Sequence, residues 1–233
     1  MKKAIKKKKE EVVVISVGGS LICPEEVDTA FLASLKELVL SGVKSGKRFI
    51  IITGGGKVCR KYQNAANSLG GSIADADWIG IDSTRLNARL VKSMIGSKAE
   101  DHIIQSPLEK FVFKKSVIVA GGWKPGFSSD HDAVLLAKRF KASKLINLSN
   151  IDYVYTADPK TNPDAKKIER ITWKEFRKLI PKKWVPGLSS PFDPVASKES
   201  ESIGLEVAII NGKKLAELEN YLAGKEFVGS LIK

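Results

Sequence analysis

Cysteine and histidine are scarce in this chain of 233 residues, which has only Cys23, Cys59, His102 and His131. The two cysteines have no metal-ligand spacing, and no HxxEH or CxxC pattern occurs, so the sequence disfavours a zinc site. So few cysteines also suggest the reducing cytoplasm, where we expect the protein to reside. Two isolated histidines are more simply explained as surface or structural residues than as a catalytic pair.

Long apolar runs are also missing. No stretch approaches the roughly 20 apolar residues that a membrane-spanning helix needs. The lysine-rich start, MKKAIKKKKEE, is not followed by the apolar segment of a signal peptide. The contents of 43% hydrophobic and 28% charged residues are typical of a soluble protein, and the length suits one large core. We therefore expect a disordered basic tail over residues 1–11 and a single domain over residues 12–233.

The formal net charge of +13 has two possible meanings. Six lysines lie within the first nine residues, so much of the excess belongs to the tail and not to a folded surface. A basic balance can indicate nucleic-acid binding, but it suits phosphate-bearing substrates equally well. No stripe of interleaved aromatic and basic residues favours nucleic acid, so we consider that partner unlikely.

Strand and helix patterns alternate from residue 12 onward. This alternation predicts an α/β fold with a mainly parallel sheet and helices on both faces. The expected strands are 12–17, 48–52, 101–105, 116–120, 144–148, 153–156, 167–171, 206–210 and 226–232. The expected helices are 25–44, 56–68, 77–94, one that begins near 128–130, 172–180, 195–203 and 214–222.

Glycine clusters follow three of these strands directly, at residues 18–19, 54–56 and 121–122. The loops that leave the carboxyl ends of parallel strands line the ligand crevice of an open sheet. Three glycine loops on one edge could therefore approach a polyphosphate through their backbone N–H groups. The chain has neither a GxxxxGK[ST] P-loop nor a GxGxxG fingerprint, so the common nucleotide-binding folds are disfavoured.

The stretch 116–141, SVIVAGGWKPGFSSDHDAVLLAKRFK, combines these features. A β-branched strand is followed by a glycine loop, and Ser128, Ser129 or Asp130 can cap the helix that comes next. Such an arrangement aims several N–H groups and hydroxyls at one anion. An ordinary strand-to-helix turn explains this stretch equally well when it is taken alone.

Several motifs, in their order along the chain, resemble the amino-acid kinase superfamily and, within it, the UMP kinases of archaeal type. These motifs are GGS (18–20), GGGK with Arg60, WIG with TRLNA (78–88), GGWKPG (121–126), SNIDYVYTADP (149–159) and FDPVASK (192–198). The resemblance covers nearly everything from residue 12 onward, and it implies a three-layer α/β/α sandwich.

The resemblance also implies transfer of the γ-phosphoryl group of ATP to UMP, with Mg²⁺, by a homo-oligomer that is hexameric in the family. The implied ATP-binding positions are Gly19, Ser20, Gly56, Ser149, Tyr155 and Asp158. The implied UMP-binding positions are Gly55, Arg60, Asp77, Trp123, Lys124, Pro125, Gly126, Phe127, Ser128 and Ser129. Arg60, Asp152 and Asp193 are the candidate catalytic residues, and no residue is assigned as a metal ligand.

Each catalytic candidate also has a plain structural explanation. Arg60 could be a solvated arginine on an amphipathic helix, and Asp152 could stabilise a turn through its side chain. Asp193 could cap a helix that has Pro194 at its first position, a role that can coexist with a functional one. Lys198 is more simply a solvated helix residue. Because a phosphate acceptor is already anionic, we expect the aspartates to orient a metal or lysine network and not to act as bases.

Five positions depart from the family pattern. Ser16 stands where many members of the superfamily have a phosphate-binding lysine, Trp123 replaces a usual threonine, and Tyr153 replaces a usual glycine. Ser128 and Ser129 replace a threonine pair but keep its hydroxyls. The indole of Trp123 could stack on the acceptor base or indicate another acceptor. Two alternatives to a UMP kinase therefore stay open: a kinase of the same superfamily with a different small acceptor, and a catalytically weak nucleotide-binding or storage protein.

Overall fold

The computed structural model describes residues 11–183 and 190–233. Residues 1–10 of the expected tail and part of the loop before Asp193 therefore lie outside the described residues, whereas Glu11, which we assigned to the tail, begins the first strand. The division into a tail and one domain stays a prediction. In the described ranges, a seven-stranded sheet has the strand order β3-β2-β1-β4-β8-β9-β7, and β5 pairs with β6 in a separate two-stranded sheet.

The strands of the large sheet are mostly parallel. They are β1 (Glu11–Val17), β2 (Lys47–Thr53), β3 (Val117–Ala120), β4 (Lys144–Ser149), β8 (Glu206–Asn211), β9 (Ser230–Ile232) and β7 (Arg170–Ile171). All pairings from β3 to β8 are parallel, and only the β8–β9 pairing is antiparallel. β5 (Val154–Tyr155) and β6 (Lys167–Ile168) form the antiparallel hairpin. The predicted, mainly parallel sheet is confirmed.

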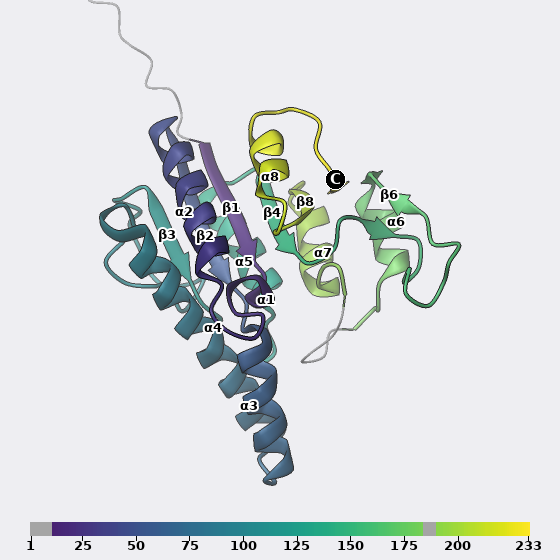
Figure 1. Ribbon diagram of the computed structural model, residues 1–233, viewed down its shortest axis with the longest axis horizontal. Coiled ribbons are helices and arrows are strands. Elements are labelled where there is room, and N and C mark those ends of the chain that lie inside the picture. The colour runs from purple at the N-terminus through teal and green to yellow at the C-terminus, as the bar shows by residue number, and fades with distance from the viewer. Residues whose placement is uncertain (1–10, 184–189) are drawn as a thin grey trace, which may run out of the picture.

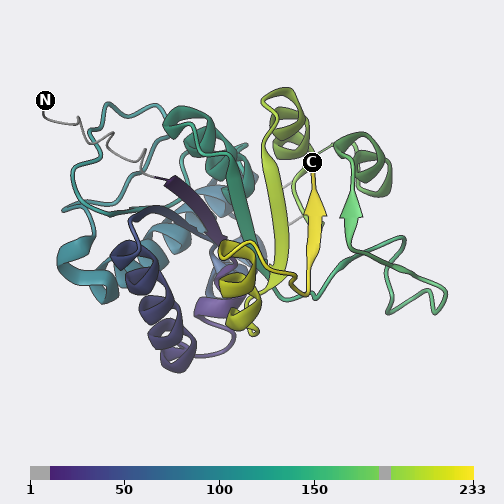
Figure 2. The same cartoon turned by 90° about the horizontal axis from the view of Figure 1, so that it is seen from above.

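Helices cover both faces of this sheet, as Figures 1 and 2 show. They are α1 (Gly19–Ile22), α2 (Thr29–Lys44), α3 (Gly56–Ser68), α4 (Ile73–Ile95), the short 3₁₀ turn η1 (Gly96–Lys98), α5 (Ser129–Phe140), α6 (Trp173–Leu179), α7 (Pro194–Ser202) and α8 (Leu215–Leu222). The sheet and its two helical layers form the expected three-layer sandwich.

The alternation of side chains along β1 explains the two cores. Val13, Ile15 and Val17 pack on one face with α2, α4 and α8, whereas Val14 packs on the other face with α5, α6 and α7. All four side chains are fully buried. Ser16 lies on the second face beside Val14, so its hydroxyl points toward α5.

Some predicted boundaries were wrong. The helix expected from residue 25 begins at Thr29 because the Asp28 side chain caps it, accepting from the N–H of Phe31 (2.9 Å). The helix expected from residue 77 begins at Ile73, where Ser72 and Asp75 form a capping box. The one-turn helix α1 was not predicted.

One expected strand is absent, and another is shorter than predicted. Residues 101–105 form no strand, and this region makes only isolated bridges to β3 at Ala99 and Ile104. The last strand begins at Ser230 and not at residue 226. In both cases only part of the predicted segment pairs with a neighbouring strand, and sequence periodicity cannot show how far that pairing extends.

Candidate functional site

The three glycine loops lie where the parallel sheet predicts them, at the carboxyl ends of the adjacent strands β1, β2 and β3. The first two loops touch through their backbones. A Cβ atom on Gly19 would lie 2.1 Å from the amide nitrogen of Gly56, and a Cβ on Gly56 would lie 2.5 Å from the carbonyl oxygen of Gly19. Gly56 also has a positive φ of 72°. Glycine is therefore required at both positions for the loops to approach so closely.

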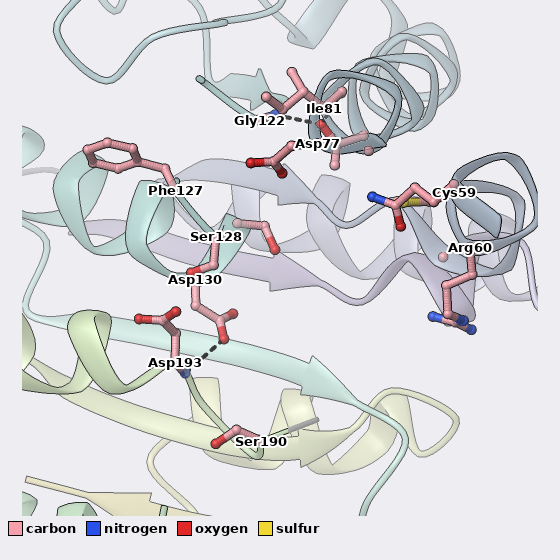
Figure 3. Close-up of a pocket in the computed structure, with 16 residues that line it drawn as sticks. Cys59, Arg60, Asp77, Ile81, Gly122, Phe127, Ser128, Asp130, Ser190 and Asp193 are labelled. Carbon is pink, nitrogen blue, oxygen red and sulfur yellow. Dashed lines mark hydrogen bonds between the residues drawn. The ribbon is translucent and has the colours of Figure 1, made fainter. Parts of the chain in front are cut away.

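A cavity of about 320 Å³ opens beside these loops, between α3, α4, α5 and the start of α7. Figure 3 shows the side chains that project into it. Eight of the predicted site residues line the cavity: Gly55, Gly56, Arg60, Asp77, Phe127, Ser128, Ser129 and Asp193. Gly19 belongs to the same rim through its contact with Gly56.

Two aspartates, Asp130 and Asp193, meet in the lower part of this cavity (Figure 3). Oδ2 of Asp130, in the first turn of α5, accepts a hydrogen bond from the backbone N–H of Asp193 (3.2 Å). Oδ1 of Asp130 accepts from the Ser16 hydroxyl (3.4 Å). Burial and then the nearby charge of Asp193 raise the pKa of Asp130 to about 7.

Asp193 has the capping role that the sequence suggested as its simpler explanation. Its Oδ1 accepts from the N–H of Ala196 (2.7 Å), and Pro194 occupies the first position of α7. The residue is 5% exposed and still lines the cavity. The cap therefore fixes the Asp193 backbone in the orientation that reaches Asp130. Lys198, on the same helix, is exposed as expected.

Asp77 approaches the cavity from α4. Its Oδ2 accepts from the N–H of Gly126 (3.1 Å), so it holds the far part of the loop over residues 122–128. Ser128 caps α5 by accepting from the N–H of His131 (3.1 Å). Of the three capping candidates that the sequence offered for α5, Ser128 is the one that caps the helix.

Arg60 is exposed and lies one turn into α3. In Figure 3 its guanidinium lies well apart from the Asp130 and Asp193 carboxylates, on the side of the cavity nearer α3. Cys59, its neighbour, also lines the cavity, and burial raises the pKa of its thiol. An exposed arginine on the rim of a cavity can turn toward an anion that enters the cavity.

The four residues from Trp123 to Gly126 do not line the cavity. The indole of Trp123 packs against the ring of Phe127, with centroids 4.6 Å apart, and the Lys124 ammonium lies 4.2 Å from the indole centroid. Phe127 in turn stacks on His131 (4.9 Å, 9°). The aromatic side chains thus form a small cluster that stiffens the loop.

Of the residues predicted to bind ATP, Gly19 and Gly56 lie at the cavity, whereas Ser20, Ser149, Tyr155 and Asp158 do not line it. Ser149 ends β4, and Tyr155 lies in the β5–β6 hairpin. Asp158 supports a turn by accepting from the N–H of Lys160 (2.9 Å). Ser20 lines a second cavity of about 500 Å³ between α1, α2 and the residues after β8.

Asp152 is part of a lysine-bearing network, as one interpretation of the sequence expected. Its Oδ1 lies 2.8 Å from Nζ of Lys214 and accepts from the Asn211 amide (2.9 Å). The hydrogen bond from Lys214 is the main cause that lowers the pKa of Asp152. Asp152 does not line the cavity beside Asp130.

Sequence reasoning gave no site role to several residues that line the cavity, among them Asp130, Gln63 and Thr84. Asp130 was considered only as a helix cap, Thr84 only as part of the TRLNA motif, and Gln63 not at all. The signal for Asp130 was its place directly after Ser128 and Ser129 at the start of a helix that follows a glycine loop. Its partner Asp193 is 63 residues away, so only the strand order could bring them together.

No helix of the described residues is long and apolar enough to cross a membrane. Those residues also contain no group of three or more His, Cys, Asp or Glu side chains arranged to hold a metal ion. A metal in this cavity would therefore need ligands from a bound substrate in addition to protein carboxylates.

A mainly parallel sheet with three glycine loops at the carboxyl ends of its strands defines an α/β protein whose loop N–H groups suit the binding of phosphate groups. The model of the amino acid kinase family matches residues 11–211, and the chain belongs to this family.

Among known proteins, the chain is similar to uridylate kinases of archaea. It is 32% identical over 216 residues to the uridylate kinase of Pyrococcus abyssi, covering 91% of this chain and 96% of that protein. It is 34% identical over 223 residues to the uridylate kinase of Hyperthermus butylicus, covering 94% and 97%.

Solved structures agree with this relationship. The crystal structure of uridylate kinase from Archaeoglobus fulgidus is similar with a TM-score of 0.78 and 30% sequence identity, covering 95% of this chain and 99% of that one. The UMP kinase from Bacillus anthracis has a TM-score of 0.79 at 20% identity, with 97% of both chains covered, and this supports the fold alone.

Proposed function

We propose that this chain is a UMP kinase that transfers the γ-phosphoryl group of ATP to UMP and produces UDP for pyrimidine nucleotide biosynthesis. The observation that carries the proposal is the cavity beside the glycine loops. There, Arg60 on α3 and Asp77 on α4 line the walls of the cavity. Asp130 and Asp193 line its lower part, at the starts of α5 and α7 (Figure 3). Uridylate kinases that match along nearly the whole chain support the same activity.

Asp77 and Arg60 suit a nucleotide acceptor. Arg60 can grip two oxygens of the acceptor phosphate, because a guanidinium is planar and presents paired donors. Asp77 offers a carboxylate to ribose hydroxyls while it holds Gly126. A small carboxylate acceptor would need no such ribose contact, so this pair favours UMP over the acceptors of other kinases in the family.

Phosphoryl transfer requires positioning and charge neutralisation more than covalent chemistry from the protein. The backbone N–H groups of the glycine loops, with Gly19 and Gly56 in contact, would bind the phosphates of the donor and the acceptor. Ser128 and Ser129 add hydroxyls at the start of α5. We place the adenosine part of ATP toward Ser149, Tyr155 and Asp158, with Ser20 near its phosphates.

Mg²⁺ fits the residues present. Asp130 and Asp193 offer hard carboxylate oxygens at the edge of the cavity, and Mg²⁺ typically uses one or two carboxylates together with substrate phosphates. We propose that Asp130 holds the ion, supported by Asp193. When bound with ATP, Mg²⁺ neutralises charge on the phosphates. Without a cation, the Asp130 carboxyl is partly protonated near neutral pH, because its pKa is raised to about 7.

We further propose a homo-oligomer in the cytoplasm. No side chain of helix α3 is fully buried, and Figure 1 shows the helix extending away from the sheet. Tyr62, Leu69 and Ile73 on the α3–α4 hairpin are 65%, 87% and 80% exposed. A second copy of the chain could cover this apolar surface, and a hexamer, as the resemblance implies, would contain such contacts. Light scattering of the protein and of Leu69→Glu tests this proposal.

A coupled ADP-release assay tests the activity. We expect turnover with UMP to exceed turnover with CMP, dUMP, acetylglutamate and isopentenyl phosphate, and we expect EDTA to abolish it. Faster turnover with acetylglutamate or isopentenyl phosphate would replace the proposal with another kinase of the family. ATP binding without turnover of any acceptor would instead indicate a nucleotide-binding protein.

A further inference from the structure

The loop over residues 122–128, which we call the acceptor loop because the proposed function places UMP beside it, is held in an unusual way at its start. All four backbone polar groups of Gly122 and Trp123 are bonded to side chains. The N–H of Gly122 donates to Oγ1 of Thr84 (2.6 Å), and the N–H of Trp123 donates to Oδ2 of Asp132 (3.0 Å). The two carbonyl oxygens both accept from Arg85, at 3.2 and 2.9 Å.

These side chains come from two different helices. Thr84 and Arg85 lie on α4, whereas Asp132 lies on α5, so the start of the loop is clamped between them. A Cβ on Gly121 would lie 2.8 Å from Cγ of Arg85, which shows how closely the backbone approaches α4. The far end of the same loop is held by Asp77 through Gly126.

Asp132 is the exceptional member of this clamp. It is 1% exposed, and its Oδ1 has no hydrogen-bond partner among the described residues. A buried carboxyl with an unsatisfied oxygen destabilises a fold. Burial raises the pKa of Asp132 to about 7, and the nearby charge of Arg85 opposes this rise. Among the described residues, the hydrogen bond that this carboxyl accepts comes from the Trp123 N–H.

We infer that Asp132 is a positioning residue that, together with Arg85, fixes the start of the acceptor loop and thereby sets the affinity for the acceptor nucleotide. It does not line the cavity, so it acts through the loop and not on UMP itself. Gly122 and Trp123 precede Gly126, which Asp77 holds, and also Ser128 and Ser129, which line the cavity. If the start of the acceptor loop loosened, the loop residues on the UMP side of the cavity would therefore move as well. The inference rests on the proposed function for the identity of the acceptor.

The test compares Asp132→Val, Asp132→Asn and Asp82→Asn in the full chain. Valine removes the acceptor for the Trp123 N–H, whereas asparagine keeps one without the charge. Asp82 is the matched control, because its carboxylate also lies beside Arg85 (3.4 Å) but its side chain is 72% exposed. Hydrogen exchange of the peptide that contains residues 122–127 reports the order of the loop without any substrate.

For Asp132→Val we expect exchange of the Trp123 amide to quicken at least about tenfold. We also expect the KM for UMP to rise about tenfold while the KM for ATP stays within about twofold. In Asp132→Asn, the exchange of the Trp123 amide and the KM for UMP should both return most of the way to the values of the unaltered protein. Asp82→Asn should change neither the exchange nor the KM. Should the valine variant fail to fold, Arg85→Lys carries the same test, since lysine cannot hold both carbonyl groups as arginine does.

Unchanged exchange in Asp132→Val would overturn the inference, as would an equal rise of the two KM values. Faster exchange with an unchanged KM for UMP would show an anchored loop that does not contribute to acceptor binding, which also overturns it. These outcomes differ from a failure of the proposed function, which would appear as absent UMP turnover in the unaltered protein.

Discussion

Asp193 donates its backbone N–H to the side chain of Asp130 across 3.2 Å, and this contact joins the starts of α5 and α7. The two side chains carry like charges, while the cations of the cavity lie elsewhere, with Arg60 on its α3 side. Burial, together with the nearby charge of Asp193, raises the pKa of Asp130 to about 7, so a cation bound beside the pair would favour its ionised form. In the proposed kinase, Mg²⁺ brought with ATP supplies the charge.

The first prediction concerns Asp130→Asn, which should lower kcat about 10²-fold because it removes the charge that holds the cation. At the same time it should stabilise the protein at pH 8. The native pKa of about 7 lies above the ordinary value of 3.8. Between pH 4 and 7 the native state therefore binds a proton that the unfolded state does not, and the free energy of unfolding falls as pH rises.

Urea denaturation at several pH values measures this effect. At pH 8 we expect Asp130→Asn to exceed the parent in free energy of unfolding by on the order of 1–3 kcal/mol, with the difference vanishing near pH 4. Asp101→Asn is the control, because a hydrogen bond from Lys115 lowers the pKa of this exposed carboxyl and gives no such gain. Equal stability of Asp130→Asn and the parent at pH 8 would contradict the prediction.

The second prediction concerns Arg60. If its guanidinium turns onto the acceptor phosphate, Arg60→Ala should lower kcat/KM for UMP about 10- to 150-fold, since a charge-assisted hydrogen bond contributes roughly 1.5–3 kcal/mol. Arg60→Lys should recover part of this. Lys61→Ala is the matched control on the same helix, because Lys61 lies 3.7 Å from Glu25 on the exposed surface. Near-normal kcat/KM in Arg60→Ala would remove Arg60 from the acceptor site.

The layers of the fold were predictable from the sequence because the central strands are continuous β-branched runs buried on both faces. Val12–Val17 and Arg48–Ile52 were each placed within one residue of β1 and β2. The ends of the sheet were not predictable in the same way. The length of β9 depends on its antiparallel partner β8, and the start of α4 depends on a capping box that precedes its apolar face.

For the candidate site, spacing placed the glycine loops correctly because parallel strands end at the same edge of a sheet. Spacing could not reveal that Asp130 contacts Asp193, or that Asp132 contacts Trp123. The first pair depends on the order of distant elements, and the second depends on the direction in which one buried carboxyl points. Asp132 lies among apolar residues of a helix, where the pattern predicts only packing.

The third prediction concerns Trp123, for which the sequence suggested stacking on the acceptor base. The indole packs on Phe127 and Lys124 and does not line the cavity, so we expect Trp123→Ala to loosen the aromatic cluster. The free energy of unfolding should fall by about 1–3 kcal/mol. The side-chain contacts that hold the start of the acceptor loop bind the backbone of Gly122 and Trp123 and not the indole, so they persist in this variant. Steady-state kinetics should therefore show no selective rise of the KM for UMP. A KM that rises about tenfold or more for UMP alone would restore the stacking role.

The last prediction separates two costs of replacing a glycine: the cost of a left-handed backbone conformation and the cost of crowding where two glycine loops touch. Gly56 and Gly224 have the same φ of 72°, but only Gly56 has neighbours within reach of a Cβ atom. Gly224→Ala should therefore cost only the left-handed penalty, about 1–2 kcal/mol of unfolding free energy, with full activity. Gly56→Ala must in addition push Gly19 away, because its Cβ would lie 2.5 Å from the Gly19 carbonyl oxygen.

We therefore expect Gly56→Ala to lower the free energy of unfolding by at least about 2 kcal/mol more than Gly224→Ala does. Gly56→Ala should also lose most of its turnover, because separated loops no longer aim their N–H groups at one phosphate. Thermal or urea denaturation of the two variants gives the first quantity, and the ADP-release assay gives the second. Equal destabilisation would mean that the loops can separate freely. Full activity in Gly56→Ala would mean that their contact does not shape the phosphate site.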